Sequence, residues 1–145
     1  MIRQAVPEDR AAIQRLYESL CPREPVHVIA SRIEQIQEDA AHFLLVHVMD
    51  GKVNGSIFLS FCPNPMFGTL PFAVVENLIV DPQHRGGGIG RKLMQAAEEL
   101  ARENRCTKLM LLSAHAEEQA QRFFGGLGYA SENCVGFEKN LGTSV

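Results

Sequence analysis

The sequence lacks any run of apolar residues long enough to cross a membrane, and it lacks the apolar core of a signal peptide near its start. A membrane-spanning helix needs about 20 consecutive apolar residues. The first ten residues, MIRQAVPEDR, include four charged side chains, which does not fit a secretory signal. We therefore expect a cytoplasmic protein that does not associate with membranes.

Patterns typical of metal and nucleic-acid binding are also missing. There is no C-x-x-C pair among the widely spaced cysteines, which are Cys21, Cys62, Cys106 and Cys134. Neither a zinc site nor a disulfide framework is indicated, so we expect reduced cysteines that act as small apolar residues, and no metal. Lysine and arginine form no sustained run, and the net charge is -3. General nucleic-acid binding needs a concentrated basic face and is not expected.

The length and composition are those of one globular domain. A chain of 145 residues can bury about two thirds of its unfolded surface in a single core. Apolar residues make up 46% and charged residues 21%, values that are ordinary for such a domain. No repeat, low-complexity tract or linker divides the chain, and we expect a single domain over residues 1–145.

The most informative stretch runs from Phe72 to Leu93, with the sequence FAVVENLIVDPQHRGGGIGRKL. It predicts a strand at 72–80, a turn with a proline, a glycine cluster at 86–90 and an amphipathic helix. A helix N-terminus that follows glycines presents unpaired backbone N–H groups, and the helix dipole there favours anions. The stretch therefore predicts a phosphate cradle.

Two common glycine-rich phosphate sites do not fit the spacing. A nucleotide-hydrolase loop needs G-x-x-x-x-G-K followed by Ser or Thr, but Arg91 stands five residues after Gly86, and Lys92 is followed by Leu93. A dinucleotide fingerprint needs G-x-G-x-x-G, and counting from Gly86 or Gly88 its last position falls on Arg91 or Leu93. Nucleotide hydrolysis is therefore disfavoured.

The remaining elements follow from apolar periodicity and from turn residues. Proline and glycine make the segment 62–71 irregular, and its apolar residues Met66, Phe67 and Leu70 either line a site or interface or cap the core. The run 108–112 predicts a strand that is parallel to its neighbour and buried on both faces. The other expected elements are a strand at 2–5, helices around Ile13–Leu20 and Ile29–Asp39, a hairpin of strands 42–49 and 53–61, helices 89–104 and 117–127, and closing strands at Tyr129 and 135–141.

The pattern Arg85-x-x-Gly88-x-Gly90, after a strand that ends at Val80, resembles the acyl-CoA loop of the GCN5-related N-acetyltransferase (GNAT) superfamily. The strand VVENLIVDP and the later segment AQRFFGGLGY are similar to further motifs of that family. The resemblance spans residues 2 to about 141. It implies an α/β fold of one domain, with a mixed, mostly antiparallel central sheet, a splayed parallel pair of strands and flanking helices. A homodimer is expected, since dimers are common in the family.

The resemblance also implies acetyl-CoA as the acetyl donor. Its pyrophosphate would lie on the glycine N–H groups, with charge-assisted contacts from arginine. Its pantetheine arm would pair with the end of the central strand, where a main-chain N–H can receive developing negative charge. The residues assigned to acetyl-CoA are Leu78, Ile79, Val80, Arg85, Gly86, Gly87, Gly88, Ile89, Gly90, Arg91 and Phe123.

An acceptor amine must lose a proton before it attacks, which costs about 4 kcal/mol at neutral pH for a lysine-like ammonium. Glu76 is the first candidate base because it interrupts an apolar run, where burial would raise its pKa. Alternatively, Glu76 and Asn77 form a β-bulge or bind substrate without proton transfer. His115 is a second candidate, although an ordinary loop histidine is the simpler interpretation.

The protonation of the departing thiolate is less clearly assigned. Phe124 stands where the family often has a tyrosine. The acid is then Tyr129, Ser113 or a water molecule, or the thiolate leaves unaided at a cost of about 2 kcal/mol. We therefore predict Glu76 and Tyr129 as the catalytic residues.

Two functions follow from the resemblance. The first is an acetyl-CoA-dependent N-acetyltransferase that acts by direct attack of a primary amine, carried by a small molecule or a peptide. The second is an acyl-CoA sensor without turnover, which the missing tyrosine at position 124 favours.

Overall fold

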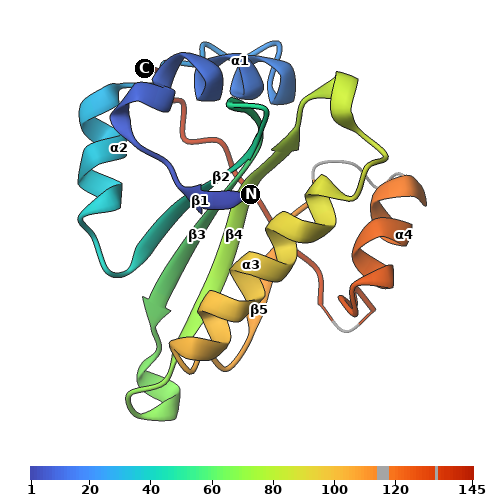
Figure 1. The fold of residues 1–145 in the computed structure, drawn as a ribbon. Helices are drawn as coiled ribbons and strands as arrows, with labels where there is room; N and C mark the ends of the chain where they lie inside the picture. The colour runs from blue at the N-terminus through green and yellow to red at the C-terminus, as the bar shows by residue number, and fades with distance from the viewer. Residues whose placement is uncertain (114–117, 133) are drawn as a thin grey trace.

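The computed structural model describes residues 1–113, 118–132 and 134–145, and in them a twisted sheet of five strands lies between helices (Figure 1). The strand order is β1-β2-β3-β4-β5; all neighbours are antiparallel except β4 and β5, which are parallel. The expected mixed sheet is confirmed. The elements are β1 (Ile2–Gln4), η1 (Pro7–Asp9), α1 (Arg10–Leu20), α2 (Ala30–Gln37), β2 (His42–Met49), β3 (Lys52–Pro63), η2 (Pro65–Phe67), β4 (Pro71–Val80), η3 (Pro82–His84), α3 (Ile89–Glu103), β5 (Leu109–Leu111) and α4 (Glu118–Gly126), where η denotes a 3-10 helix.

The turn between β2 and β3 is the predicted hairpin. Asp50 and Gly51 both have positive φ, at 51° and 74°. A two-residue turn with positive φ at both positions matches the right-handed twist of the flanking strands, and aspartate and glycine are the residues that tolerate it. The register of the two antiparallel strands therefore starts from this turn.

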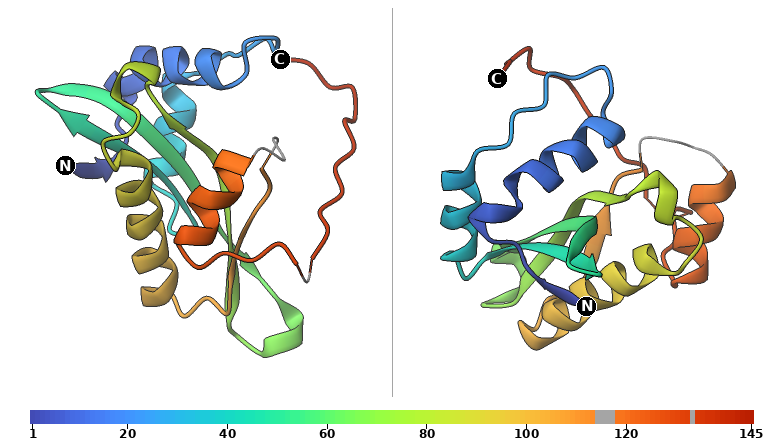
Figure 2. Two further views of the ribbon diagram at one scale, coloured as in Figure 1. Left: turned by 90° about the vertical axis from the view of Figure 1, so that its right-hand side faces the viewer. Right: turned by 45° about the horizontal axis from the view of Figure 1, so that its top comes forward.

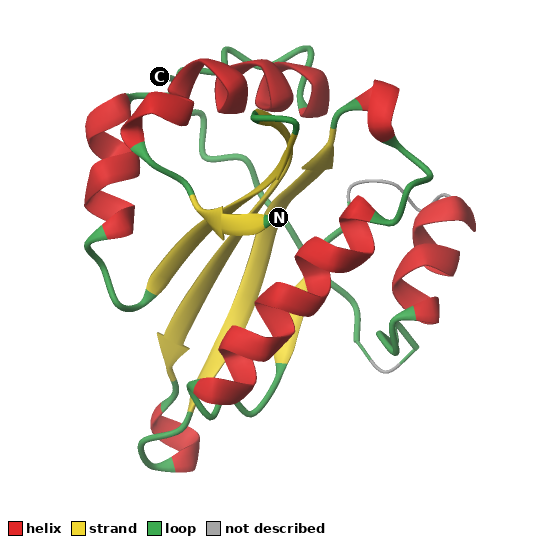
Figure 3. Ribbon diagram, in the orientation of Figure 1, coloured by secondary structure: helices red, strands yellow, loops and turns green. Residues whose placement is uncertain are grey.

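Each face of the sheet has its own core, and helices cover both faces (Figures 2 and 3). Helix α3 packs on one face, where its buried Leu93 and Met94 meet β-strand residues such as Ile57 and Leu59. Helices α1 and α2 pack on the other face through Ile13, Ile33 and their neighbours. No helix of the described ranges is long and apolar enough to cross a membrane.

A partly buried ion pair fixes the start of the chain. Arg3 on β1 donates to both carboxylate oxygens of Asp9, at 2.7 and 3.0 Å, and the Val6 N–H donates to the same carboxylate at 2.9 Å. Asp9 is only 8% exposed. The hydrogen bonds from Arg3, and to a smaller extent the one from the Val6 N–H, lower the pKa of Asp9, although burial acts in the opposite direction. The ion pair therefore holds the turn η1 against β1.

The expected closing strands are wrong. Residues 128–132 and 134–145 contain no strand, and the C-terminal segment runs outside the sheet (Figure 2). An alternating apolar pattern forms a strand only where it pairs with an edge, and the described C-terminal segments make no such pairing. Strand β5 is consequently an edge, and its expected burial on both faces is also wrong, since Met110 is 44% exposed.

Candidate functional site

Strands β4 and β5 separate after three paired positions. Their pairing ends with Val75 opposite Leu111, whereas β4 continues to Val80. The backbone groups of residues 76–80 that face the β5 side therefore have no strand partner in the described chain. This is the splayed parallel pair that the resemblance implied, and Leu78, Ile79 and Val80 lie on its open side.

A β-bulge lies where this opening begins. Ile57 on β3 stands opposite two residues of β4, Asn77 and Leu78, because the register shifts between Ser56 and Phe58. Asn77 has φ of 54°, a left-handed conformation that asparagine tolerates better than most residues with side chains. A bulge bends its strand, and it therefore helps to explain why β4 leaves β5 here. The β-bulge that the sequence allowed at Glu76 and Asn77 is thus present, while the role of Glu76 in proton transfer stays a prediction.

Glu76 precedes the bulge, and its side chain is exposed. The desolvation expected for this carboxylate is wrong, because the bulge and the separation from β5 leave position 76 open to water. Glu76 pairs in register with Phe58, a residue that packs against the core under α1 and α2. The carboxylate therefore belongs to the α1–α2 face of the sheet.

The glycine cluster leads directly into α3. Gly86 and Gly88 have φ of 85° and 82°, and Gly88 is the N-cap of the helix. A Cβ added at either residue would meet no atom within 4 Å, so this backbone is open to a ligand. The Lys92 N–H donates to the Gly88 carbonyl at 3.0 Å. The preceding N–H groups of the first helical turn have no partner four residues back. The predicted phosphate cradle therefore has the required geometry.

The two predicted arginines flank the cradle and are exposed. The Arg85 Nε donates to the Val80 carbonyl at 3.2 Å, which ties the loop to the end of β4. The Arg91 guanidinium lies on the α4 side, with Nη2 3.8 Å from where a Cβ of Gly126 would be. Both positive charges stand next to the N-terminus of α3, so either can contact an anion bound there.

Gly90 allows helix α4 to pack closely against α3, which the sequence alone did not indicate. A Cβ at this position would lie 3.2 Å from Phe123 Cζ and 3.7 Å from Val80 Cγ2. The missing side chain thus allows α4 to approach the first turn of α3. Phe123 is brought beside the cradle, as the resemblance implied.

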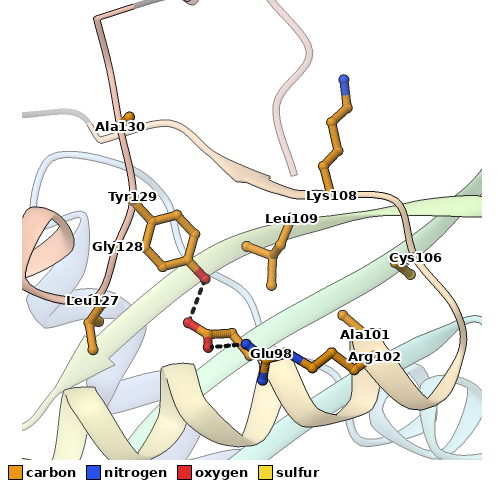
Figure 4. Close-up of a pocket in the computed structure, with 10 residues that line it drawn as sticks. All are labelled: Glu98, Ala101, Arg102, Cys106, Lys108, Leu109, Leu127, Gly128, Tyr129 and Ala130. Atoms are coloured by element: carbon orange, nitrogen blue, oxygen red, sulfur yellow. Dashed lines mark hydrogen bonds and ion pairs between the residues drawn. The ribbon is translucent and has the colours of Figure 1, made fainter.

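Phe124 and Tyr129 belong to a packed aromatic group. The Phe124 ring lies edge-on to both Phe123 and Tyr129, at centroid distances of 5.0 and 6.1 Å. The Tyr129 hydroxyl donates to Glu98 Oε1 at 2.9 Å, and Glu98 also pairs with Arg102 (Figure 4). Burial, and then the carboxylate of Glu98, raise the pKa of Tyr129. The hydroxyl is therefore held protonated and already committed to a partner.

Tyr129 lines a cavity of about 420 Å³ together with Lys108 and Leu109, next to the start of β5 (Figure 4). Leu109 is the residue that pairs with Ala73, at the closed end of the parallel pair. Tyr129 also packs against the core under α3, on the face opposite to Glu76. The structure thus does not bring the two predicted catalytic residues together.

Of the two remaining candidate residues, the structure describes Ser113 but not His115. Ser113 follows β5 on the splayed side, and His115 lies outside the described residues. Within residues 1–113, 118–132 and 134–145, no group of three or more His, Cys, Asp or Glu side chains could hold a metal ion.

Comparison with known proteins agrees with this geometry. A sequence model of the acetyltransferase (GNAT) family matches residues 10–129. The chain is 31% identical over 83 residues to glucosamine 6-phosphate N-acetyltransferase of Trypanosoma brucei brucei, covering 57% of this chain and only 54% of that protein. It is 28% identical over 142 residues to aminoglycoside N(6')-acetyltransferase type 1 of Stenotrophomonas maltophilia, covering 95% and 86%. A putative acetyltransferase of Agrobacterium tumefaciens superimposes with a TM-score of 0.88 at 26% identity, covering 97% and 99%.

Proposed function

The chain belongs to the acetyltransferase (GNAT) family, and from that premise we propose that it transfers an acetyl group from acetyl-CoA to a primary amine. The proposal rests on two features that lie next to each other, the unpaired end of β4 and the glycine cradle at the start of α3. The strand β4 loses its β5 partner after Val75 and, after Val80, leads directly into the glycine cradle of α3. A ligand with an anionic diphosphate and an amide-containing arm matches both features, since the diphosphate suits the cradle and the arm suits the unpaired strand end.

The residues present fit this co-substrate. Gly86 and Gly88 offer a backbone that no side chain covers, and the N–H groups of the first turn of α3 favour a diphosphate. Arg91 supplies a nearby positive charge. The unpaired edge of Leu78–Val80 can hydrogen-bond the amides of the arm as an added strand would. When bound, acetyl-CoA supplies a thioester whose carbonyl carbon an amine can attack.

Proton removal is proposed for Glu76. Its exposed carboxylate stands one residue before the bulge and can take a proton from an amine directly or through water. A main-chain N–H of the bulged segment, with Leu78 as the first candidate, would stabilise negative charge on the acetyl oxygen. No side chain is assigned to protonate the thiolate, because Tyr129 is bound to Glu98 and position 124 is phenylalanine.

For the acceptor we propose an amine on a small molecule, with amino sugars as the first class to test. Two relatives are named for glucosamine 6-phosphate and for aminoglycosides. The loop around η2 exposes Met66 and Phe67, at 76% and 49%, and it stays a candidate for an acceptor or subunit contact. The expected homodimer and cytoplasmic location stay predictions.

The direct test is release of free thiol from acetyl-CoA in the presence of amino sugars, polyamines and peptide amines. We expect amine-dependent release, and Arg91→Ala should raise the KM for acetyl-CoA about tenfold because a charge-assisted contact is lost. Arg102→Ala is the matched control, since it removes an exposed arginine of the same helix away from the cradle. Equal effects of the two substitutions, or no binding of acetyl-CoA by calorimetry, would refute the proposal.

The second candidate function is a sensor that binds acyl-CoA without turnover. The lack of a hydroxyl at Phe124, packed between Phe123 and Tyr129, favours it. Calorimetric binding of acetyl-CoA with no thiol release across the amine panel would support the sensor. Turnover that Glu76→Gln reduces would exclude it.

A further inference from the structure

The side chains next to Glu76 form a row across the sheet, on the same face as α1 and α2. Phe58 on β3 pairs in register with Glu76, and residues that pair in register share one face of a sheet. Met110 on β5 pairs with Val74, two residues before Glu76, so it also lies on this face. The carboxylate therefore stands between an aromatic ring on one side and an exposed methionine on the other.

The row continues to β2, where the ring of His42 is stacked on that of Phe58. The two ring centroids are 6.0 Å apart, and the planes differ by 8°. His42 Nδ1 lies 3.1 Å from a carboxylate oxygen of Asp39, and these two side chains are 39% and 46% exposed. Glu76 is exposed and Phe58 is half-buried. A ligand can therefore reach the Glu76 surface, which consists of Asp39, His42, Phe58 and Glu76.

The polar groups of the Glu76 surface are suited to accept hydrogen bonds. The Ala41 N–H donates to Asp39 at 2.7 Å, and this bond, followed by the one from His42, lowers the pKa of Asp39. Because Nδ1 of His42 donates to Asp39, Nε2 of the neutral ring is an acceptor. Strands β2 and β4 and residues 53–63 of β3 contain no lysine or arginine. The surface therefore suits a ligand rich in N–H and O–H donors, and it does not suit an anionic group.

The spacing of the strands sets the length of a ligand that fits this surface. Neighbouring strands are about 4.8 Å apart, so β2 and β4 are separated by about 10 Å. An amine that reaches both Glu76 and the pair of His42 and Asp39 therefore needs a second donor group about 10 Å from the first. A single sugar ring is shorter than this. Between the two ends, the Phe58 ring offers an apolar contact and attracts a nearby ammonium.

We propose that the Glu76 surface binds the acceptor, and that the acceptor is an extended amine with a second ammonium group, as in aminoglycosides and polyamines. The inference rests on the proposed function, because Glu76 is there the group that takes the proton of the reacting amine. Phe58 contacts the carbon skeleton of the acceptor, and Asp39 with His42 binds the distant ammonium. A phosphorylated amino sugar is disfavoured, since its phosphate would meet carboxylates.

Steady-state kinetics with three acceptors test the class of acceptor. Kanamycin and spermidine each carry several ammonium groups, whereas glucosamine 6-phosphate carries one ammonium and a phosphate. We expect kcat/KM for one of the two polycations to exceed that for glucosamine 6-phosphate at least tenfold, and the better of the two identifies the kind of carrier. Equal values for all three compounds, or a preference for the phosphorylated sugar, would overturn the proposal.

Asp39→Asn tests the contact with the second ammonium. The asparagine oxygen can still accept from the Ala41 N–H, so the turn is kept while the negative charge is lost. We expect the KM for the preferred polycation to rise about fivefold to tenfold, because a charge-assisted contact is removed. Glu99→Gln is the matched control, since it removes an exposed carboxylate from α3, on the other face of the sheet. Equal effects of the two substitutions would contradict the assignment.

Phe58→Leu tests the role of the ring. Leucine keeps the apolar contact with the core under α1 and α2. The KM for the acceptor should rise about threefold to tenfold, whereas the KM for acetyl-CoA should change less than about twofold. An equal rise in both KM values would indicate a general disturbance of β3 and would reject Phe58 as a specificity residue.

A binding measurement keeps this inference distinguishable from the proposed function. Spermidine or kanamycin, added to ligand-free protein labelled with 15N, should shift the amide signals of His42 and Phe58, and Asp39→Asn should weaken this binding about fivefold or more. If the wild type releases no thiol with any amine, the proposed transfer fails, while these shifts still test the surface. Shifts confined to Met66 and Phe67, or no shifts at all, would reject the Glu76 surface as the acceptor site.

Discussion

Replacement of Gly88 by alanine tests the cradle backbone most simply. Gly88 has φ of 82°, and an added Cβ would meet no atom within 4 Å, so the cost is conformational and not steric. An L-residue in the left-handed region costs about 1–2 kcal/mol. Alanine also restricts the unfolded chain, which returns about 0.4–1 kcal/mol. We therefore expect a net loss of about 1 kcal/mol in the free energy of unfolding.

Gly87→Ala is the matched control. Its φ lies outside the left-handed range, and the nearest atom to an added Cβ is the His84 carbonyl oxygen at 3.7 Å, an ordinary contact. Both alanines restrict the unfolded chain equally, so the difference between the variants isolates the strain at Gly88. Thermal unfolding should give Gly88→Ala the lower Tm, by about 2–8 °C for a domain of this size. Equal Tm values would refute the reasoning.

Three further substitutions test the ion pair, the Tyr129 hydroxyl and the candidate base. Asp9→Asn should lower the free energy of unfolding at pH 7 by about 2–3 kcal/mol, between the values for exposed and fully buried pairs. Because the pKa of Asp9 is lowered in the folded state, this stabilisation is present above about pH 4 and is lost as the pH falls through the folded-state pKa. Urea titrations of wild type and Asp9→Asn at pH 7 and pH 3 measure the loss of stability at each pH. An equal loss at both pH values would contradict the prediction. Tyr129→Phe should cost about 1 kcal/mol of stability, since it breaks the bond to Glu98; a stable variant with a tenfold lower kcat would instead support an acid role. Glu76→Gln should lower kcat about 100-fold if the carboxylate is the base, and an unchanged pH profile of kcat would exclude that role.

The sequence predicted correctly those turns, strand ends and helix starts that depend only on residues close together in the chain. The Asp50-Gly51 turn, the strand that ends at Val80 and the helix that begins at Ile89 all follow from residues close in the chain. The cradle was predictable for the same reason, because glycine spacing and a helix start are both local features. The position of Phe123 beside the cradle was predicted only from the family resemblance.

Features that depend on distant residues were missed or wrong. The edge position of β5 depends on whether the C-terminal segment pairs with it, which an alternating pattern does not decide. The exposure of Glu76 depends on the bulge and on the end of the β4–β5 pairing.

A crystal structure with acetyl-CoA bound would test the central claim most directly. The account predicts the diphosphate on the N–H groups of the first turn of α3, beside Gly86 and Gly88, and the arm along Leu78–Val80. The acetyl group should then lie next to the bulge, on the side from which Glu76 can be reached. Acetyl-CoA bound instead in the cavity beside Tyr129 and Glu98, with the glycine cradle empty, would contradict the account.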